Sequence, residues 1–258
     1  MLFGRHPVLE LLRAESRRVD EVAIVAHGRS PALLDLLALA KGRGVKISFR
    51  TREQLTAMAG RADHQGVVAR VAAAAYADVE SLLALAGARS EPAFLLALDR
   101  VQDPRNLGTI LRSAEATGAH GLILAKHHSV GLTPGAAKSA TGAAELVRVA
   151  RVTNMVSALE GLKKEGLWIV GAVTRGGTAP WTADLAMPLC FVLGGEGAGL
   201  RPLVAKTCDL LVTVPMKGEL DSLNVAAVAA ILCYEVTRQR GVPARKSGGD
   251  PNSRKALT

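Results

Sequence analysis

Three stretches of the chain combine glycines with polar side chains that are candidates for a binding site. They are residues 95–119, 191–200 and 214–236. Glycine allows the backbone to approach a ligand closely. Arginine stays protonated in proteins, binds phosphate in a bidentate manner and stabilises negative charge that develops on oxygen. The polar candidates in the three stretches are Asn106, Arg112, Glu196, Ser222 and Asn224.

Four of these polar residues also have a structural interpretation when each is taken alone. Ser222 precedes an apolar segment and is placed to cap a helix there. Glu196 suits a helix N-terminus, where the helix dipole favours a carboxylate. Asn106 is compatible with a turn amide, and Asn224 could tie its loop to a backbone carbonyl. By itself, the last stretch favours a capped core helix, so a functional interpretation depends on all three stretches together.

The glycine turn does not match the common nucleotide-binding loops. The G-x-G-x-x-G spacing fails because the glycine that follows Gly195 and Gly197 is Gly199, one position early. A Walker A loop fails because Lys138 follows Ala137 and not a glycine. No glycine fingerprint follows the first strand of this half of the chain, as a Rossmann-type methyltransferase would have. Neither NAD nor a nucleoside triphosphate is indicated, and a tight strand–helix turn is the alternative for the glycines alone.

The elements that must position these residues alternate between strand and helix over residues 93–240, which predicts a mostly parallel sheet with helices on both faces. Asp103 and Pro104 predict a helix start. Arg105 and Arg112 lie one heptad apart on the side of that helix away from its apolar stripe. The predicted strands are residues 93–99, 121–125, 168–171, 188–194 and 210–214, and the apolar stripe is Leu107, Ile110, Leu111 and Ala114. The segment after Asn224 is small and apolar on most sides, so we expect it to be buried on most sides.

The first part of the chain, residues 1–75, shows the same alternation on a smaller scale and predicts a layered α/β domain. Thr51 and Gln54 are spaced as a helix capping box. Residues 76–92 are rich in alanine and are expected to form a linker that holds at most one short helix. Residues 93–240 form the second domain, and residues 241–258 read as a disordered basic tail.

The composition narrows the class of partner and the compartment. The chain has 258 residues with 32 Lys and Arg against 23 Asp and Glu, a net charge of +9, which fits a polyanionic partner but also serves solubility. Cys190, Cys208 and Cys233 form no C-x-x-C pair and lie in apolar surroundings, as expected for free thiols in a reducing cytoplasm. No histidine or cysteine spacing indicates a metal. No signal peptide or membrane span is expected.

Together the three stretches resemble the motifs of the SpoU/TrmH family of RNA ribose 2′-O-methyltransferases, within the knotted SPOUT superfamily. The motifs N-L-G-x-x-x-R at residues 106–112, G-x-E-G at 194–197 and S-L-N-V at 222–225 occur in the family order. The segment H-Q-G-V-V-A-R-V at residues 64–71 is similar to the junction segment of the 23S rRNA guanosine-2′-O-methyltransferases of the RlmB type.

The resemblance implies an α/β-knot fold, with residues from about 195 to 235 threaded through a loop and a small N-terminal α/β domain that binds RNA. It also implies S-adenosylmethionine held by three late loops, a homodimer formed through the knot region and an RNA substrate, with no DNA expected. The five polar residues named above would then be catalytic, with Arg112 acting either as a base or as an electrostatic anchor. The implied cofactor residues are Gly171, Ala172, Val173, Gly194, Gly195, Val214 and Leu223.

Two alternatives to a large-subunit rRNA methyltransferase follow from the same motifs. One is a methyltransferase acting on tRNA or on another rRNA position. The other is a non-catalytic RNA-binding homologue that keeps the fold and the charge. A degenerate copy would be expected to lose its polar motif residues first, and all five are present, which favours the enzyme.

Overall fold

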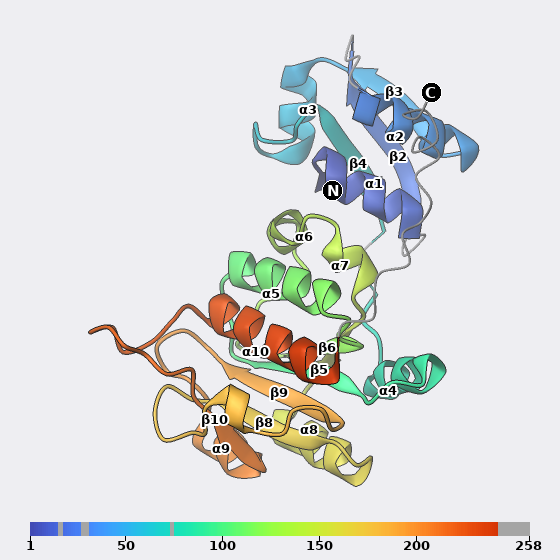
Figure 1. Cartoon of the computed structure of the whole chain (residues 1–258). Coiled ribbons are helices and arrows are strands. Elements are labelled where there is room, and N and C mark those ends of the chain that lie inside the picture. The colour runs from blue at the N-terminus through green and yellow to red at the C-terminus, as the bar shows by residue number, and fades with distance from the viewer. Residues whose placement is uncertain (15–17, 27–30, 73–74, 242–258) are drawn as a thin grey trace, which may run out of the picture.

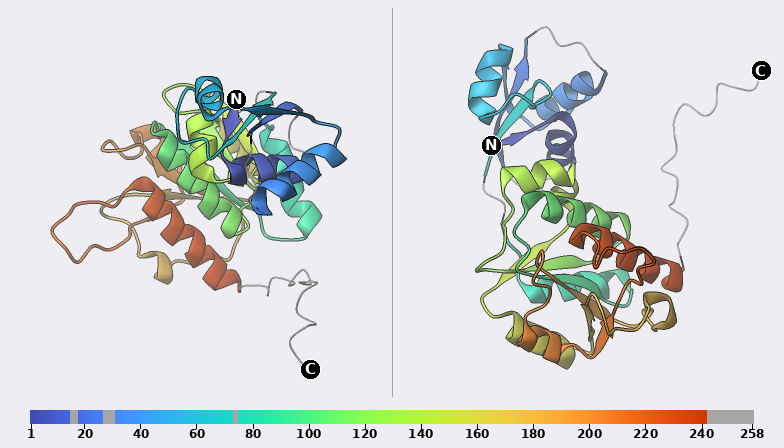
Figure 2. Two further views of the ribbon diagram at one scale, coloured as in Figure 1. Left: turned by 90° about the horizontal axis from the view of Figure 1, so that it is seen from above. Right: turned by 90° about the vertical axis from the view of Figure 1, so that its left-hand side faces the viewer.

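The computed structural model describes residues 1–14, 18–26, 31–72 and 75–241 as two α/β domains, one stacked on the other (Figure 1). The smaller domain is N-terminal. It rests on the side of the larger domain that carries the helices α6 (Pro134–Ala140) and α7 (Ala143–Leu146), as a second direction of view also shows (Figure 2). The predicted tail, residues 241–258, lies outside the described residues apart from Gly241.

The N-terminal domain is built on a four-stranded sheet in the order β1-β4-β2-β3. Strands β2 and β3 are parallel, and β4 runs antiparallel to both of its neighbours. The predicted capping box is confirmed, since the Thr51 side chain accepts from the Gln54 backbone and the Gln54 side chain accepts from the Thr51 backbone. The elements are β1 (Leu2–Phe3), α1 (Arg5–Ala14), β2 (Val19–Val25), α2 (Pro31–Gly42), β3 (Lys46–Arg50), α3 (Arg52–Ala59) and β4 (Val67–Val71).

The larger domain is built on a six-stranded sheet in the order β10-β8-β9-β5-β6-β7, and every described strand pair in it is parallel. The predicted parallel sheet is therefore confirmed. Its strands are β5 (Phe94–Asp99), β6 (Gly121–Ala125), β7 (Val149–Val152), β8 (Trp168–Ala172), β9 (Leu189–Gly194) and β10 (Leu210–Val212). Its other helices are α4 (Val79–Arg89), α5 (Pro104–Ala116), α8 (Met155–Lys164), α9 (Pro202–Thr207) and α10 (Val225–Arg240), with a 3-10 turn η1 (Pro180–Thr182).

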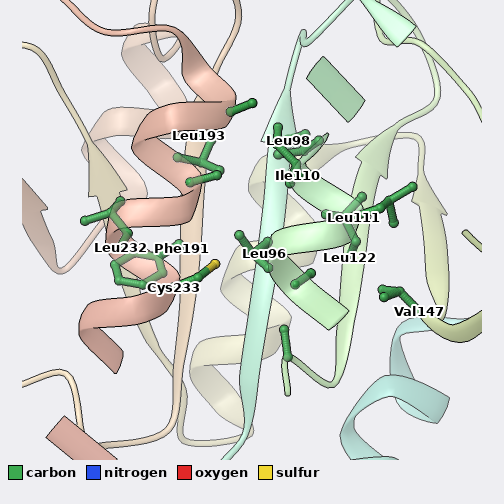
Figure 3. Close-up of a cluster of buried hydrophobic side chains, with 14 of the residues drawn as sticks. Leu96, Leu98, Ile110, Leu111, Leu122, Val147, Phe191, Leu193, Leu232 and Cys233 are labelled. Atoms are coloured by element: carbon green, nitrogen blue, oxygen red, sulfur yellow. The ribbon is translucent and has the colours of Figure 1, made fainter. Parts of the chain in front are cut away.

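Helices cover both faces of this sheet. Alternate β5 residues Phe94, Leu96 and Leu98 face α5, α6 and α10, while Leu95 and Ala97 face α4, α8 and α9. Figure 3 shows the first of these cores, where α5 and α10 lie on the same side of the strands. The predicted stripe of α5 is fully buried in it, because its spacing matches the helical repeat.

Two expectations about helices need correction. Residues 76–92 are more than a linker, because α4 inserts the fully buried Leu82 into the core beside β5 and so belongs to the larger domain. Helix α10 is not buried on most sides within one chain. It buries one face on α5 and leaves Ala227, Ile231 and Tyr234 exposed on another.

The close packing of α5 on α6 depends on Gly108, and this gives a prediction. A Cβ atom at Gly108 would lie 2.7 Å from the Ala136 carbonyl oxygen and 2.7 Å from the Ala140 nitrogen. We expect Gly108→Ala to lower the free energy of unfolding by about 1–3 kcal/mol, because overpacking forces the backbones apart. Chemical denaturation measures the change.

Gly161→Ala is the matched control. Gly161 is also inside a helix, α8, but a Cβ atom there would meet nothing within 4 Å. That substitution should raise the free energy of unfolding by about 0.5–1 kcal/mol, through the higher helix propensity of alanine. Equal stability of the two variants would show that α5 and α6 do not pack as closely as described.

Candidate active site

A cavity of about 300 Å³ opens where the carboxyl ends of β8, β9 and β10 meet. Three loops surround it: the segment after β8, the glycine turn after β9, and the segment that joins β10 to α10. In an open parallel sheet, ligands bind at the carboxyl ends of the strands. The cavity therefore lies where this fold is expected to hold a small molecule.

Most of the predicted cofactor residues line this cavity, namely Ala172, Val173, Gly194, Val214 and Leu223. Two do not. A Cβ atom at Gly171 would lie 2.7 Å from the Cys208 sulfur, and a Cβ atom at Gly195 would collide with the Arg100 carbonyl oxygen. Both glycines thus allow close packing behind the cavity and do not form its wall.

Other lining residues were not predicted from the sequence. They are Thr174, Leu193, Gly197, Ala198, Gly199, Leu200, Ala205, Val212, Met216, Asp221, Val225, Val228 and Leu232, and Ser222 was predicted in a catalytic role. Most are apolar residues within a few positions of a predicted loop, so widening each loop would have found them. Leu232 and Val228 come from α10, and only the folding of that helix back onto the sheet brings them to the site.

The glycine turn itself is shaped by close backbone contacts. A Cβ atom at Gly194 would collide with the backbone of Gly199, whose amide donates to the Gly195 carbonyl at 3.1 Å. Gly197 and Gly199 have φ angles of 80° and 65°, in the left-handed region that favours glycine. The turn therefore presents mainly backbone to the cavity, with polar side chains supplied by Thr174, Asp221 and Ser222.

An ion pair between a buried carboxylate and a partly exposed guanidinium holds the far end of this turn. The carboxylate of Asp99, at the end of β5, is fully buried. It accepts from Arg201 Nε at 2.8 Å and from the Arg201 backbone N–H at 3.1 Å. Because Arg201 directly precedes α9, this pair ties the start of that helix to the centre of the sheet.

Three of the five predicted catalytic residues meet in one hydrogen-bonded group, which we call the amide–carboxylate triad: Asn106, Glu196 and Asn224. The Asn106 side-chain amide donates to Glu196 Oε1 at 2.5 Å, and Asn224 Nδ2 donates to Asn106 Oδ1 at 3.1 Å. The other Glu196 oxygen accepts from the Gln102 backbone at 3.4 Å. The triad joins α5, the glycine turn and the start of α10 at the side of the cavity. From the sequence, Glu196 could orient either Arg112 or Asn106, and the structure pairs it with Asn106.

The structure corrects the predicted cap of α10. The cap is Asn224, whose side chain accepts from the Ala226 backbone at 2.8 Å. Ser222 lies two residues before it, is exposed and lines the cavity. Both residue types cap helices well, so the choice depends on where the chain enters the helix.

Arg112 stands apart from the triad. It is exposed on α5, as predicted, and within the described part of the chain its guanidinium makes no hydrogen bond or ion pair. It lines a separate groove between the two domains. Arg105, by contrast, is held by Asp103 through an ion pair of 2.9 Å, and this guanidinium lowers the pKa of the Asp103 carboxyl.

The cysteines take no part in the site. Burial raises the pKa of the Cys208 thiol to about 11 and that of Cys233 to about 12, and it raises the pKa of Cys190 as well. All three thiols are therefore protonated at neutral pH and poor nucleophiles. Among the residues that the structure describes, no group of His, Cys, Asp or Glu could hold a metal ion. No helix in the described ranges is long and apolar enough to span a membrane.

Comparison with known proteins yields two family matches that together extend over most of the chain. Residues 93–234 match the SpoU rRNA Methylase family, and residues 1–77 match the model described as RNA 2′-O ribose methyltransferase substrate binding. A curated relative, the 23S rRNA (guanosine-2′-O-)-methyltransferase RlmB of Coxiella burnetii, is 40% identical over 94% of this chain and 97% of its own length. The putative TrmH family tRNA/rRNA methyltransferase YacO of Bacillus subtilis is 40% identical over 93% of this chain and 95% of its own.

Among solved structures, the SpoU methyltransferase AviRb from Streptomyces viridochromogenes, in complex with the cofactor AdoMet, superposes with a TM-score of 0.78. The match has 26% sequence identity and covers 93% of this chain and 89% of the other. It extends over both domains, so it does not come from the larger sheet alone.

The corrected cap gives a prediction for stability. We expect Asn224→Ala to lower the free energy of unfolding by about 1 kcal/mol, because α10 loses the acceptor for an N-terminal backbone amide. Ser222→Ala should change it by no more than about 0.5 kcal/mol, as for an exposed loop residue. Urea denaturation of both variants measures the difference, and a larger loss for Ser222→Ala would restore the cap predicted from the sequence.

Proposed function

The chain belongs to the SpoU rRNA Methylase family, and we propose that it transfers a methyl group from S-adenosylmethionine to a ribose 2′-hydroxyl of a guanosine in 23S rRNA. The observation that carries the proposal is the amide–carboxylate triad, whose members come from three stretches far apart in the chain. The triad lies beside a cavity at the carboxyl ends of parallel strands. Named 23S rRNA relatives align over nearly the full chain at about 40% identity.

The residues of the cavity fit this cofactor. Its wall is mainly apolar, as an adenine ring and a thioether chain require, and the glycine turn offers backbone N–H and C=O groups for the polar edges of a purine. Ala172, Val173, Val214 and Leu223 would hold the cofactor, together with Gly194. When bound, S-adenosylmethionine supplies a methyl group activated on a sulfonium.

The chain's own residues must align and stabilise a poor nucleophile, because a ribose hydroxyl is almost wholly protonated at neutral pH. The Arg112 guanidinium stays protonated. Its role is to bind the phosphate next to the target ribose and to stabilise negative charge on the 2′-oxygen. The triad fixes the glycine turn against α5, and so sets the position of the cofactor loop relative to the helix that carries Arg112. Ser222, at the cavity wall, is free to contact the reacting groups.

We further propose that the chain forms a homodimer through α10. Ile231 is 38% exposed and Tyr234 is 57% exposed on the face of α10 that does not pack on α5. Leu223, at the start of the same segment, is 37% exposed. Such an apolar face suits a C2 interface. Light scattering should give twice the chain mass of 26.9 kDa at micromolar concentration, and a monomer would contradict the proposal.

The trefoil knot belongs to the same proposal. After β9, the chain forms the glycine turn and α9, adds β10 at the sheet edge beyond β8, and returns to pack α10 on α5. This return path from residue 195 to 235 is consistent with threading through the preceding loop. The N-terminal domain would bind the RNA, and the three free thiols fit a reducing cytoplasm.

The function is tested by mapping 2′-O-methyl groups in rRNA and tRNA from cells with and without the gene. We expect loss of one methylated guanosine in 23S rRNA. Loss of a methyl group from tRNA alone would replace the rRNA assignment with tRNA, and no change in either RNA would contradict the enzymatic proposal.

The role of Arg112 gives a prediction for turnover. Arg112→Ala should lower turnover by about 10²-fold or more, because the charge contact acts mainly in the transition state. Stability should change by no more than about 0.5 kcal/mol, since the side chain is exposed. Single-turnover methylation of an RNA fragment measures the first and denaturation the second. Partial activity of Arg112→Lys would indicate an electrostatic role, and near-complete loss would indicate bidentate geometry or proton handling.

Arg105→Ala is the matched control on the same helix. Arg105 is one heptad from Arg112, but its guanidinium is already paired with Asp103. Its removal should leave turnover nearly unchanged. An equal loss of turnover in both variants would mean that this side of α5 is only a basic RNA-contact surface.

A further inference from the structure

We infer that two cavities that share His6 in their linings form one binding path for an RNA strand, leading from the N-terminal domain to Arg112. This inference rests on the proposed function, because it concerns how the RNA substrate reaches the larger domain. The first cavity, of about 480 Å³, lies within the N-terminal domain and is lined by Arg5, His6 and Arg52. The second, of about 570 Å³, lies between the domains and is lined by His6 and Arg112.

The first cavity has the chemistry to bind a phosphodiester backbone. Its lining contains two arginines and no carboxylate, and Leu9 and Val25 form an apolar part of its wall. Within the described residues, the Arg52 guanidinium makes no ion pair or hydrogen bond, so its donors are available to a ligand. Arg5 is oriented by the hydrogen bond from its Nε to the Gln65 carbonyl, at 3.1 Å, which leaves its terminal nitrogens to contact phosphate.

The second cavity continues the path towards the site of methylation. Helix α1 contributes His6 and Glu10 to it, and α5 contributes Arg112. Glu10 and Glu115 are its two carboxylates, and Glu10 is paired with Arg13 at 2.9 Å, which offsets its charge towards an incoming phosphate. Hydroxyl groups along the wall are suited to ribose 2′-hydroxyls, which both donate and accept hydrogen bonds. They belong to Thr109, Ser113 and Thr141.

Direct contacts between the domains fix the distance between the two cavities. Two cations contact the Phe3 ring: Arg61, at 5.6 Å from its centroid, and Lys138 of α6, at 5.5 Å. Lys138 is also ion-paired with Asp63 of the N-terminal domain. Its neighbour Ala137 is 6% exposed and packs into the N-terminal core. Figure 1 shows α6 and α7 beneath the N-terminal domain near α1, and α1 supplies His6 to the lining of both cavities.

A single strand of RNA is the occupant that fits this arrangement best. The basic groups are distributed over two neighbouring cavities that share His6, as an extended polyanion requires. The hydroxyls near Arg112 suit a ligand with its own hydroxyls at regular intervals. On this path, His6 contacts nucleotides between the one bound at Arg112 and those bound at Arg52.

The test measures equilibrium binding of a 23S rRNA fragment that the wild-type protein methylates, in the presence of S-adenosylhomocysteine. Arg52→Ala should weaken binding roughly five- to tenfold, because a charge-assisted contact to phosphate is lost. It should also lower the slope of log affinity against log salt by about 0.7, the value for one phosphate contact on a single strand. S-adenosylmethionine affinity should stay at the wild-type value.

Arg18→Ala is the matched control. It removes the same charge from the same domain, but the Arg18 side chain is 84% exposed and lines neither cavity. Arg18 lies just before the start of β2, whereas Val25, which lines the first cavity, lies at the end of that strand. Its RNA affinity and salt slope should equal those of the wild type. If Arg52→Ala binds like Arg18→Ala while the wild type methylates the fragment, the path is wrong and the proposed function stands. If the wild type methylates no RNA, the proposed function is contradicted, and the inferred path, which rests on it, is contradicted as well.

Crosslinking tests the order of contacts along the path. A photoreactive benzoylphenylalanine is placed at His6, at Arg52 or at Arg18, and each crosslinked nucleotide is mapped relative to the methylated one. Residue 6 should react closer to the methylated nucleotide than residue 52, in the same direction along the strand, and residue 18 should not react. Crosslinks in the reverse order, or none from residues 6 and 52, would overturn the inference.

Discussion

The ion pair between the buried carboxylate of Asp99 and the partly exposed Arg201 is the contact on which the rest of the site depends. It joins the end of the central strand β5 to the residue that opens α9, with the glycine turn enclosed between β9 and that residue. A carboxylate removed from water is stable only if it is paired and hydrogen-bonded, and losing the partner of a buried pair is strongly destabilising. Here the Arg201 guanidinium and its own backbone N–H meet that need. The glycine turn is therefore anchored at both ends, one in the sheet and one by charge.

The amide–carboxylate triad connects the anchored glycine turn to α5 and to the start of α10. Asn106 uses both ends of its side-chain amide, donating to Glu196 and accepting from Asn224. Because Asn106 donates in one contact and accepts in the other, the two contacts fix the orientation of its side-chain amide. As a result, α5, the cofactor loop and α10 cannot shift independently. A site that must bring a methyl group and a hydroxyl into line benefits from such fixed neighbours.

In the proposed enzyme, the triad and Arg112 lie at two different surfaces. The triad and the cavity lie at the ends of β8 to β10, where the cofactor is proposed to bind, and Arg112 lines the groove between the domains, where the RNA strand is proposed to bind. Contacts from Phe3, Asp63 and Lys138 hold the small domain over this groove. In the proposed enzyme, the junction between the domains therefore forms the groove that binds the substrate, in addition to linking the two domains.

The sequence alone determined the local elements and the chemical class of the site, because these depend on neighbours a few residues apart. The spacing of Thr51 and Gln54 predicted a capping box, and the pair Asp103 and Pro104 predicted the start of α5. The order of the three motifs identified the family. The alternation of strands with helices also predicted the parallel sheet. In each case the deciding pattern lies within a short stretch of the sequence or in the order of motifs and elements along it.

Only the tertiary structure decided which of those residues meet. Glu196 pairs with Asn106, 90 positions away in the chain. No local sequence pattern could show that Asn106, and not Arg112, is the partner of Glu196. The same holds for Gly171 and Gly195, which proved to pack behind the cavity, since their role depends on Cys208 and Arg100. The cap of α10 is Asn224 and not Ser222, because the helix begins at Val225, directly after Asn224. These outcomes depend on how distant segments pack, which a linear sequence specifies only through the complete fold.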